Sequence, residues 1–324
     1  MILLIVDPFD PPTRSIIEWL FSMGKQMIIS NNQNENEHID IASLSSFKPQ
    51  IIINGETYPL TSISSIYYRR SLKKTLNSHL FNNSIDMEKT SKKYSLMSYI
   101  AGNSNTRLEL LEYFLSGIKT FGSEAIGRIN KITALIEAKK VGLAVPETLL
   151  TKNKCELVSF MEEHDQVINK SIDVSYNYTD NTNDKWYIGY TNLVTKEFIE
   201  QVPDNFPLSL FQKKINKSFE IRSFFFNDSF YSTAIFSQQN EKTSVDYRKY
   251  DQEFPNREVP FILPEIITKK LKALLKALDL NTGSVDLIMT GKDYVFLEVN
   301  PVGQYENVSF LGNWYIEKQI AEYL

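Results

Sequence analysis

The apolar residues at the start of the chain change their spacing after a few positions, which indicates a strand followed by a helix. Residues 2–6 form an unbroken apolar run, as expected of a strand buried on both faces. Pro11 then opens a segment of helical spacing, which Gly24 is placed to end. Further strand patterns lie at 27–30, 51–54 and 63–68. With one or two amphipathic helices over 88–117, this alternation predicts an α/β domain over residues 1–125.

The middle of the chain predicts a second, smaller unit over residues 126–204. Apolar residues recur at helical spacing over 131–141. A short helix at 155–163 and a strand at 166–170 follow. The segment 175–185 is so polar that we expect an exposed, mobile loop there.

The last third of the chain, residues 205–324, is rich in strand patterns. One strong helix pattern, over 264–278, interrupts them. The predicted strands are 210–215, 220–226, 229–236, 285–289 and 294–299. We therefore expect a C-terminal subdomain made mostly of strands.

Composition narrows the classes of function. The 324 residues carry a formal charge of −4, which argues against a protein that coats nucleic acid. Cys155 is the only cysteine, so a disulfide framework and a cysteine zinc site are excluded, and three scattered histidines argue against a histidine metal site. The first apolar run is too short for a signal peptide, and no window reaches the roughly 18 apolar residues of a membrane span. We expect a soluble, cytoplasmic protein without nucleic-acid or membrane partners.

A strand–turn–strand pattern near the C-terminus carries the most informative polar residues. Glu298 and Asn300 are two positions apart, so on a strand they project from one face. Asp286 lies on the partner strand and reaches the same face if the connection has an odd length or a bulge at 290–293. Three oxygen ligands at a strand end suit Mg²⁺, whose other positions are filled by phosphate oxygens and water. The alternative is an ordinary alternating hairpin with solvent-facing carboxylates.

Basic residues earlier in the chain are candidates for contacts with phosphate. Lys170 ends a predicted strand and Lys131 starts a predicted helix, and a lysine in such a place can meet a phosphate as a point charge. Glu220 and Arg222 share one face of a predicted strand, and Arg222 can stabilise charge on a transferred phosphoryl group. Each of these residues alone is more often a solvated surface group, so their order along the chain carries more information.

That order resembles the ATP-grasp superfamily, whose members show a helical lysine, a strand lysine, a hinge, a strand arginine, and then Asp followed by Glu-x-Asn. The matching positions, over about residues 126–310, are Lys131, Lys170, Phe211–Ile215, Arg222, Asp286, Glu298 and Asn300. The resemblance implies an α/β (α+β) ATP-grasp fold with an N-terminal pre-ATP-grasp α/β domain. Its implied cofactors are ATP and Mg²⁺. It places the metal on Asp286, Glu298 and Asn300, and ATP on Lys131, Lys170, Gln212, Lys213, Lys214 and Ile215.

Other segments are similar to a narrower family, the graspetide (microviridin-type) peptide macrocyclases. Tyr67–Arg70 matches the family's aromatic-Tyr-Arg-Arg signature, with tyrosine where tryptophan is common. Asp246–Arg248, Lys217–Arg222 and Glu298–Tyr305 also match. The chain looks most similar to maturases encoded beside a SPASM-domain protein, which would then be a partner, and a homodimer is usual for the family.

The resemblance implies an ATP-dependent carboxylate ligase that acts on a ribosomal precursor peptide made of a leader and a core. It would phosphorylate Glu or Asp side chains and close ω-ester rings with Thr or Ser, or ω-amide rings with Lys. Arg222 would neutralise the charge of the acyl phosphate. Arg69, Arg70 and Arg248 would hold peptide carboxylates. Asp246 would act as a general base for the hydroxyl or only orient Arg248.

One segment departs from the ATP-grasp pattern, and two other functions stay open. Many ATP-grasp enzymes cover the phosphates with a glycine-rich loop, but residues 171–187 contain no glycine, so we assign no phosphate contact there. One alternative is a ligase that forms a linear amide on a protein tail or small molecule. The other is a non-catalytic ATP-grasp scaffold that binds peptide. Several separated arginines favour the macrocyclase over the first, and the full metal-ligand set argues against the second.

Overall fold

The chain folds into two compact units, which are described separately. The computed structural model describes residues 1–7, 10–30, 38–40, 49–69, 110, 113–123, 129–172, 177–180, 185–249 and 251–324. Unit 1 contains Met1–Gly127 and Tyr315–Leu324, and unit 2 contains Arg128–Trp314. Most of the predicted helical stretch 88–117 lies outside the described residues. Within the described ranges, no helix has the length and apolar character needed to cross a bilayer.

Unit 1 is built on a parallel sheet with the strand order β2-β1-β6-β7. Its elements are β1 (Ile2–Val6), α1 (Pro11–Ser22), β2 (Met27–Ser30), β3 (His38–Asp40), β4 (Gln50–Ile53), β5 (Glu56–Pro59), η1 (Leu60–Ser62), β6 (Ser65–Arg69), β7 (Lys119–Phe121) and α9 (Ile316–Tyr323). Every residue of β1 is buried, as its apolar run predicts. Strands β3, β4 and β5 form a separate antiparallel sheet.

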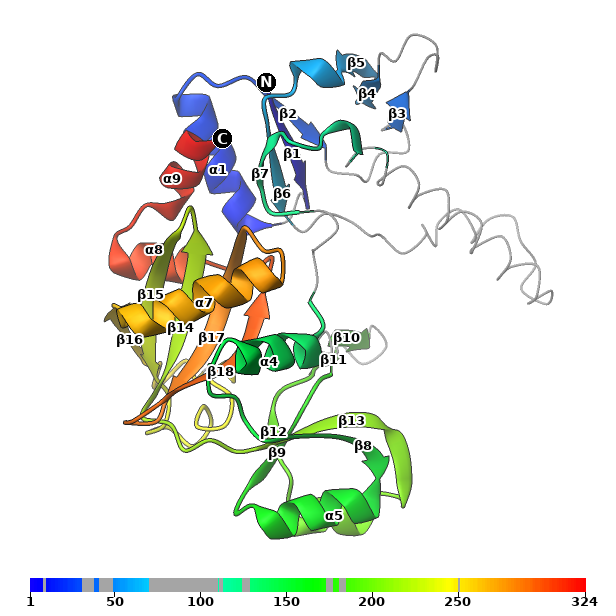
Figure 1. Cartoon of the computed structure of the whole chain (residues 1–324), viewed down its shortest axis with the longest axis vertical. Helices are drawn as coiled ribbons and strands as arrows, with labels where there is room; N and C mark the ends of the chain where they lie inside the picture. Colours follow the sequence, from blue (N-terminus) through cyan, green and yellow to red (C-terminus); the bar gives the residue numbers. More distant parts are fainter. Residues whose placement is uncertain are drawn as a thin grey trace, which may run out of the picture. The chain divides into compact units, whose positions relative to one another are not determined.

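The C-terminal helix α9 belongs to unit 1, although the sequence analysis placed residues 205–324 in one subdomain. It packs against α1 (Figure 1). Lys25 Nζ, just after α1, donates a hydrogen bond to the carbonyl oxygen of Ala321 at 2.8 Å. The end of the chain is therefore anchored to its beginning.

The described residues of unit 2 form two larger antiparallel sheets and a two-stranded one, β10-β11. Its elements are α4 (Lys131–Lys140), β8 (Thr148–Asn153), α5 (Lys154–Glu163), β9 (Val167–Lys170), β10 (Asn177–Asp180), β11 (Lys185–Ile188), β12 (Asn192–Leu193), α6 (Lys196–Gln201), β13 (Asn205–Lys213), β14 (Phe219–Phe226), β15 (Ser229–Phe236), β16 (Arg257–Phe261), α7 (Glu265–Ala277), β17 (Thr282–Met289), β18 (Tyr294–Asn300) and α8 (Glu306–Gly312). The smaller sheet has the order β12-β9-β13-β8 and the larger β16-β15-β14-β17-β18.

Strand β13 belongs to the smaller sheet, between β9 and β8. Its Phe211 joins Leu157 of α5 and Val167 of β9 in a buried apolar cluster. The boundary expected after residue 204 thus falls just before the strand that completes this sheet. The hinge segment at the end of β13 then leads into β14 of the larger sheet.

The described residues of the polar segment 175–185, where we expected a loop, belong to two strands. Strands β10 and β11 pair antiparallel with each other, with Thr179 opposite Trp186. Backbone pairing does not require apolar side chains, so a polar composition does not exclude a hairpin.

Helix α7 lies across the larger sheet (Figure 1) and buries an apolar stripe. The stripe consists of Ile267, Leu271, Leu274 and Leu275. Helix α4 packs beside β18 and α7, and Phe296 N–H of β18 donates to the carbonyl oxygen of Ala144 at 2.8 Å. These contacts fix the start of α4 relative to β18.

The stripe on α7 yields a stability prediction. Leu271 is 0% exposed, so Leu271→Ala leaves a cavity and should lower the free energy of unfolding by about 3 kcal/mol. The matched control is Ile266→Ala on the same helix, where the side chain is 64% exposed and the change should stay within about 0.5 kcal/mol. Urea denaturation of both variants measures the difference, and equal effects would contradict the packing.

Candidate active site

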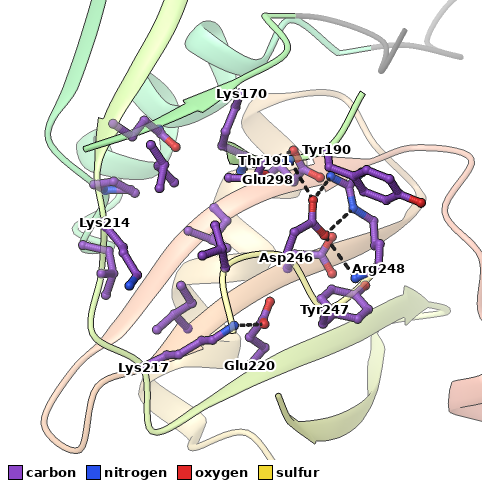
Figure 2. A pocket seen from close by; sticks show the side chains of 18 of the residues that line it. Lys170, Tyr190, Thr191, Lys214, Lys217, Glu220, Asp246, Tyr247, Arg248 and Glu298 are labelled. Atoms are coloured by element: carbon purple, nitrogen blue, oxygen red, sulfur yellow. Dashed lines mark hydrogen bonds and ion pairs between the residues drawn. The ribbon is translucent and has the colours of Figure 1, made fainter. Parts of the chain in front are cut away.

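One pocket of unit 2 lies between the two sheets and collects most of the predicted site residues (Figure 2). The predicted residues that line it are Lys131, Lys170, Gln212, Lys213, Lys214, Ile215, Arg222, Asp246, Arg248, Asp286, Glu298 and Asn300. These residues are scattered along most of the length of unit 2, so only the tertiary fold brings them together.

Three neighbouring strands place Arg222, Asp286 and Glu298 in one row on the pocket side of the larger sheet. Arg222 of β14 lies opposite Asp286 of β17, which lies opposite Glu298 of β18. Residues directly opposite each other in antiparallel strands share a face of the sheet. The row therefore alternates with buried apolar residues such as Val285 and Leu287, which face the other side.

A β-bulge brings Glu298 to the face of Asp286. The connection 290–293 has an even length, and without a bulge it would place Leu297 opposite Asp286. Instead the register shifts next to Asp286, and Leu297 is the extra residue of β18. The bulge expected at 290–293 is therefore wrong in position. The shared face itself is as predicted.

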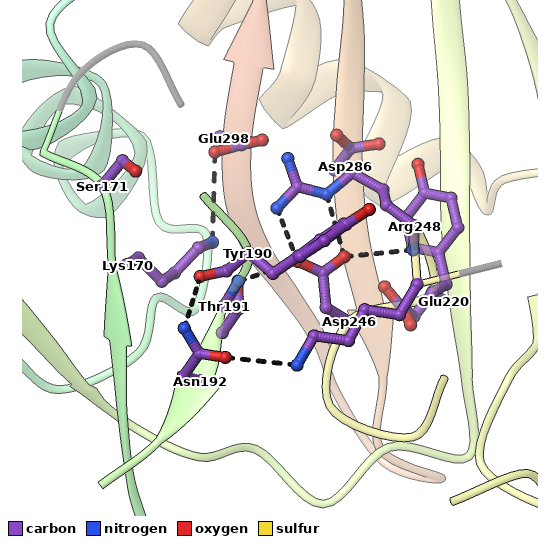
Figure 3. Close-up of polar contacts among 12 residues, drawn as sticks. Lys170, Ser171, Tyr190, Thr191, Asn192, Glu220, Asp246, Arg248, Asp286 and Glu298 are labelled. Atoms are coloured by element: carbon purple, nitrogen blue, oxygen red, sulfur yellow. Dashed lines mark hydrogen bonds and ion pairs between the residues drawn. The ribbon is translucent and has the colours of Figure 1, made fainter. Parts of the chain in front are cut away.

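Glu298 lies between two lysines. Its Oε2 is 3.2 Å from Lys131 Nζ and 3.9 Å from Lys170 Nζ, and Figure 3 shows the contact with Lys170. Lys131 is the first residue of α4, whose N-cap Asn130 accepts hydrogen bonds from the first turn, and Lys170 ends β9. Burial raises the pKa of Glu298, but Lys170 and Lys131 outweigh burial and hold the pKa at about 2. Glu298 is therefore ionised at neutral pH.

At the other end of the row, Arg222 contacts Asp286 and Tyr247. Its Nη1 is 3.4 Å from both carboxylate oxygens of Asp286 and donates to Tyr247 Oη at 2.9 Å. Burial raises the pKa of Asp286 to about 6 in spite of Arg222, and the nearby Glu298 adds to the increase. The two adjacent carboxylates thus differ in proton affinity, because Glu298 has the two lysines.

The donor set of the pocket fits a magnesium ion. Asp286, Glu298 and Asn300 present two carboxylates and an amide to it, which are ligands that Mg²⁺ prefers. Glu298 Oε2 is buried, and its close contacts are the ammonium groups of Lys131 and Lys170, which a metal ion would replace. Among the described residues, no cluster of three or more His, Cys, Asp or Glu forms a complete cage. Mg²⁺ at such a site would complete its shell with phosphate oxygens and water.

Asp246 and Arg248, which also line the pocket, form a bidentate ion pair (Figure 3). Arg248 Nε and Nη2 donate to the two oxygens of Asp246 at 2.8 and 2.6 Å, and the backbone N–H of Thr191 donates to Asp246 Oδ2 at 2.9 Å. Burial raises the pKa of Asp246, but these hydrogen bonds outweigh burial and lower it to about 2. Such a weakly basic carboxylate favours the role of orienting Arg248 over that of a general base.

The hinge segment 212–215 forms the wall of the pocket at the end of β13. Lys213 N–H donates to the carbonyl oxygen of Glu147 and Lys214 N–H to that of Gln166, both at 2.9 Å. Their ammonium groups also bond to the Glu147 and Gln166 side chains, at 3.2 and 2.8 Å. These two backbone N–H groups are therefore occupied and cannot serve the predicted adenine contact, which leaves other groups of the hinge for it.

The pocket also contains residues that the sequence did not single out as site residues, namely Tyr190, Thr191, Lys217 and Tyr247. Lys217 forms an ion pair with Glu220, which also accepts a hydrogen bond from Ser237 Oγ at 2.8 Å. Figure 2 shows this pair at the hinge end of the pocket. Tyr247 could have been noticed between two motif residues. Tyr190 and Thr191 carry no sequence signal, because they line the pocket only through the turn between β11 and β12.

Of the two arginines of the Tyr67–Arg70 segment, Arg69 lies within the described residues. Arg69 lies in unit 1, where its side chain is 2% exposed and Nε donates to Asp10 Oδ2 at 2.8 Å. Asp10 is also the N-cap residue of α1 and accepts from Thr13 Oγ1. This burial gives no support to a peptide contact for Arg69 and indicates a structural role instead. Arg70 lies outside the described residues, and its peptide contact stays a prediction.

Several solved macrocyclases and ATP-grasp ligases have a similar fold. The macrocyclase MdnC from Microcystis aeruginosa MRC, bound with the precursor peptide MdnA, superimposes with a TM-score of 0.74 at 23% identity, over 99% of this chain and 98% of that chain. A RiPP-associated ATP-grasp ligase from Chryseobacterium gregarium, in complex with ADP and a leader and core peptide, gives 0.79 at 22% identity, over 99% and 94%. The ATP-grasp ligase PsnB, complexed with minimal precursor, Mg and ADP, gives 0.74 at 15% identity, over 99% and 95%.

These likenesses define the class of fold. No family model matches the sequence, and a comparison with curated proteins gives no match. The likeness to the solved structures extends over nearly the whole chain in each case. The chain therefore has the ATP-grasp fold, and the fold class predicted from the sequence is confirmed.

The ion pair of Asp246 leads to a pH-dependent prediction. The folded state lowers its pKa from 3.8 to about 2, so ionised Asp246 stabilises the fold above pH 4, and this contribution is lost as the pH falls toward 2. Asp246→Asn should therefore lower the free energy of unfolding by about 2 kcal/mol at pH 7, with a smaller deficit at pH 3. Asp293→Asn, in the exposed turn before β18, is the matched control in urea denaturation. A deficit that does not shrink in acid would contradict this electrostatic origin.

Proposed function

We propose that this protein is an ATP-dependent carboxylate ligase that modifies a ribosomal precursor peptide. It phosphorylates Glu or Asp side chains of the peptide and closes ω-ester rings with Thr or Ser, or ω-amide rings with Lys. The observation that supports this most is the pocket itself, where paired carboxylates meet lysines and an arginine on the fold of ligases that bind ADP and precursor peptides.

The nucleotide part of the reaction follows from the charges of the pocket. Lys131 and Lys170 hold the phosphates, and the hinge 212–215 holds the adenine in the partly apolar slot that includes Ile168 and Ile288. Asp286, Glu298 and Asn300 would hold Mg²⁺, which would offset the negative charge of the phosphates. The lysines now bound to Glu298 are then free to contact phosphate.

The chemistry takes place in two steps. A carboxylate oxygen of the peptide attacks the γ-phosphorus of ATP, and ADP leaves. A hydroxyl or amine of the same peptide then attacks the acyl carbon, the bond to the phosphate oxygen breaks, and phosphate leaves while the nucleophile loses its proton. Arg222 offsets the charge on the transferred group in both steps. Because both reacting groups belong to one bound chain, ring closure benefits from a high effective concentration.

The peptide part of the pocket is supplied by Arg248. Its side chain is 43% exposed although Asp246 fixes it in a bidentate pair. Its remaining N–H donors can therefore receive a carboxylate of the acidic core. A SPASM-domain partner, a homodimer and a cytoplasmic location are further proposals that rest on the sequence resemblance alone.

Intact mass spectrometry tests the proposal. The protein is incubated with Mg-ATP and a Thr/Glu-rich precursor peptide encoded nearby, and the peptide should lose one water for each ring closed. Mild alkaline hydrolysis then separates esters from amides. A mass increase of one residue would instead favour the linear-amide ligase. Nucleotide binding without any turnover would favour the non-catalytic scaffold.

The ion pairs of Glu298 generate a prediction for nucleotide binding. Without a metal, Glu298 repels phosphate and engages both lysines, so Glu298→Gln should tighten metal-free ADP binding about fivefold. The same variant should lose most of the increase in ADP affinity that Mg²⁺ confers. Calorimetric titration of ADP in EDTA and in Mg²⁺ measures both effects.

Glu265→Gln provides the control for this titration. Glu265 is an exposed carboxylate of α7 that pairs with Lys269, outside the pocket. Its replacement should alter neither titration. If Glu298→Gln weakens metal-free ADP binding, or preserves the full magnesium effect, Glu298 is not the shared partner of metal and lysines.

A further inference from the structure

Tyr247 lines the pocket but has no role in the reaction proposed above. Its hydroxyl oxygen accepts a hydrogen bond from Arg222 Nη1 at 2.9 Å. In the sequence it lies between Asp246 and Arg248, which form an ion pair. The backbone N–H of Thr191 donates a hydrogen bond to Asp246 of this pair. The loop that carries Arg248 is thereby tied to the arginine in the carboxylate row.

The chemical state of Tyr247 makes its hydroxyl a hydrogen-bond donor. Burial, together with the nearby Asp286, raises the pKa of Tyr247, so the phenol keeps its proton at neutral pH. A phenol oxygen that accepts from Arg222 still has its own proton to donate. Within the described part of the chain, no hydrogen bond uses that proton.

The position of Tyr247 in the pocket places its hydroxyl proton near the expected site of the terminal phosphoryl group of a nucleotide. In Figure 2 the hinge residue Lys214 lies on one side of the pocket, Tyr247 and Arg248 lie on the other, and Lys170 and Glu298 lie between them. A nucleotide with its base at the hinge and its first phosphates at the lysines would direct its terminal phosphoryl group toward Arg222 and Tyr247. Both groups then present donors to the same oxyanion.

We propose that Tyr247 is a γ-phosphoryl contact, which holds Arg222 in place and donates its hydroxyl hydrogen bond to an oxygen of the phosphoryl group that Arg222 neutralises. A neutral donor beside the guanidinium adds directionality without another full charge. This inference rests on the proposed nucleotide site and adds a residue to it.

The test compares two nucleotides that differ in the γ-phosphoryl group. Tyr247→Phe keeps the ring and removes only the hydroxyl. In Mg²⁺ it should weaken AMPPNP binding about tenfold, the effect of one lost hydrogen bond to a charged group, while ADP binding stays unchanged. Unchanged ADP affinity also shows that the variant has kept its fold. Tyr294→Phe is the matched control, because Tyr294 packs against Phe261 outside the pocket, and it should change neither affinity.

Each outcome of this titration bears on a different claim. An unchanged AMPPNP affinity in Tyr247→Phe, or an equal loss for both nucleotides, would overturn the role of Tyr247 and leave the ligase proposal standing. A wild-type protein that binds neither nucleotide would overturn the nucleotide site and the role of Tyr247 with it. With a peptide substrate in hand, Tyr247→Phe should lower kcat more than it raises the KM for ATP.

Discussion

The pairing of Asp286 with Glu298 across β17 and β18 is the constraint on which the site depends. Two carboxylates side by side in a partly desolvated pocket repel each other, and both stay ionised only if cations lie close by. Arg222 at one end of the row and Lys131 and Lys170 at the other supply those cations. These three cations and two carboxylates leave the row within one charge of balance, and a metal with a polyphosphate can replace the internal pairs without leaving buried charges alone.

That balance requires the whole of unit 2 to be folded. Lys170 comes from the smaller sheet, Lys131 from the start of α4, and Arg222 from the larger sheet. A hydrogen bond from Phe296 of β18 to Ala144 holds the segment after α4, and the ion pair with Lys131 holds the helix start near Glu298. No single hairpin or helix of the chain could hold this set of charges, so the site is a property of the arrangement of both sheets.

The sequence predicted elements best where the hydrophobic period was unambiguous. The buried run of β1, the amphipathic α7 and the strands β14 and β15 all appeared within a residue or two of their expected bounds. The motif order also identified the fold class. The bulge at Leu297 could not be placed, because register is decided by pairing with β17 and not by local composition. The burial of Arg69 was hidden for a similar reason, since its partner Asp10 lies far away in sequence.

The segment 246–248 shows why motif residues alone understate a site. The motif leaves Asp246 either as a general base or as a residue that orients Arg248. Its oxygens accept hydrogen bonds from Arg248 and from the Thr191 backbone, which favours the second role. Tyr247, which lies between these two motif residues in the sequence, accepts a hydrogen bond from Arg222. One short loop therefore contacts Arg222 through Tyr247 and holds its own Arg248 through Asp246. In the proposed reaction, a peptide carboxylate bound to Arg248 would for this reason lie next to the phosphoryl group at Arg222, and these three consecutive residues would link substrate recognition to phosphoryl transfer.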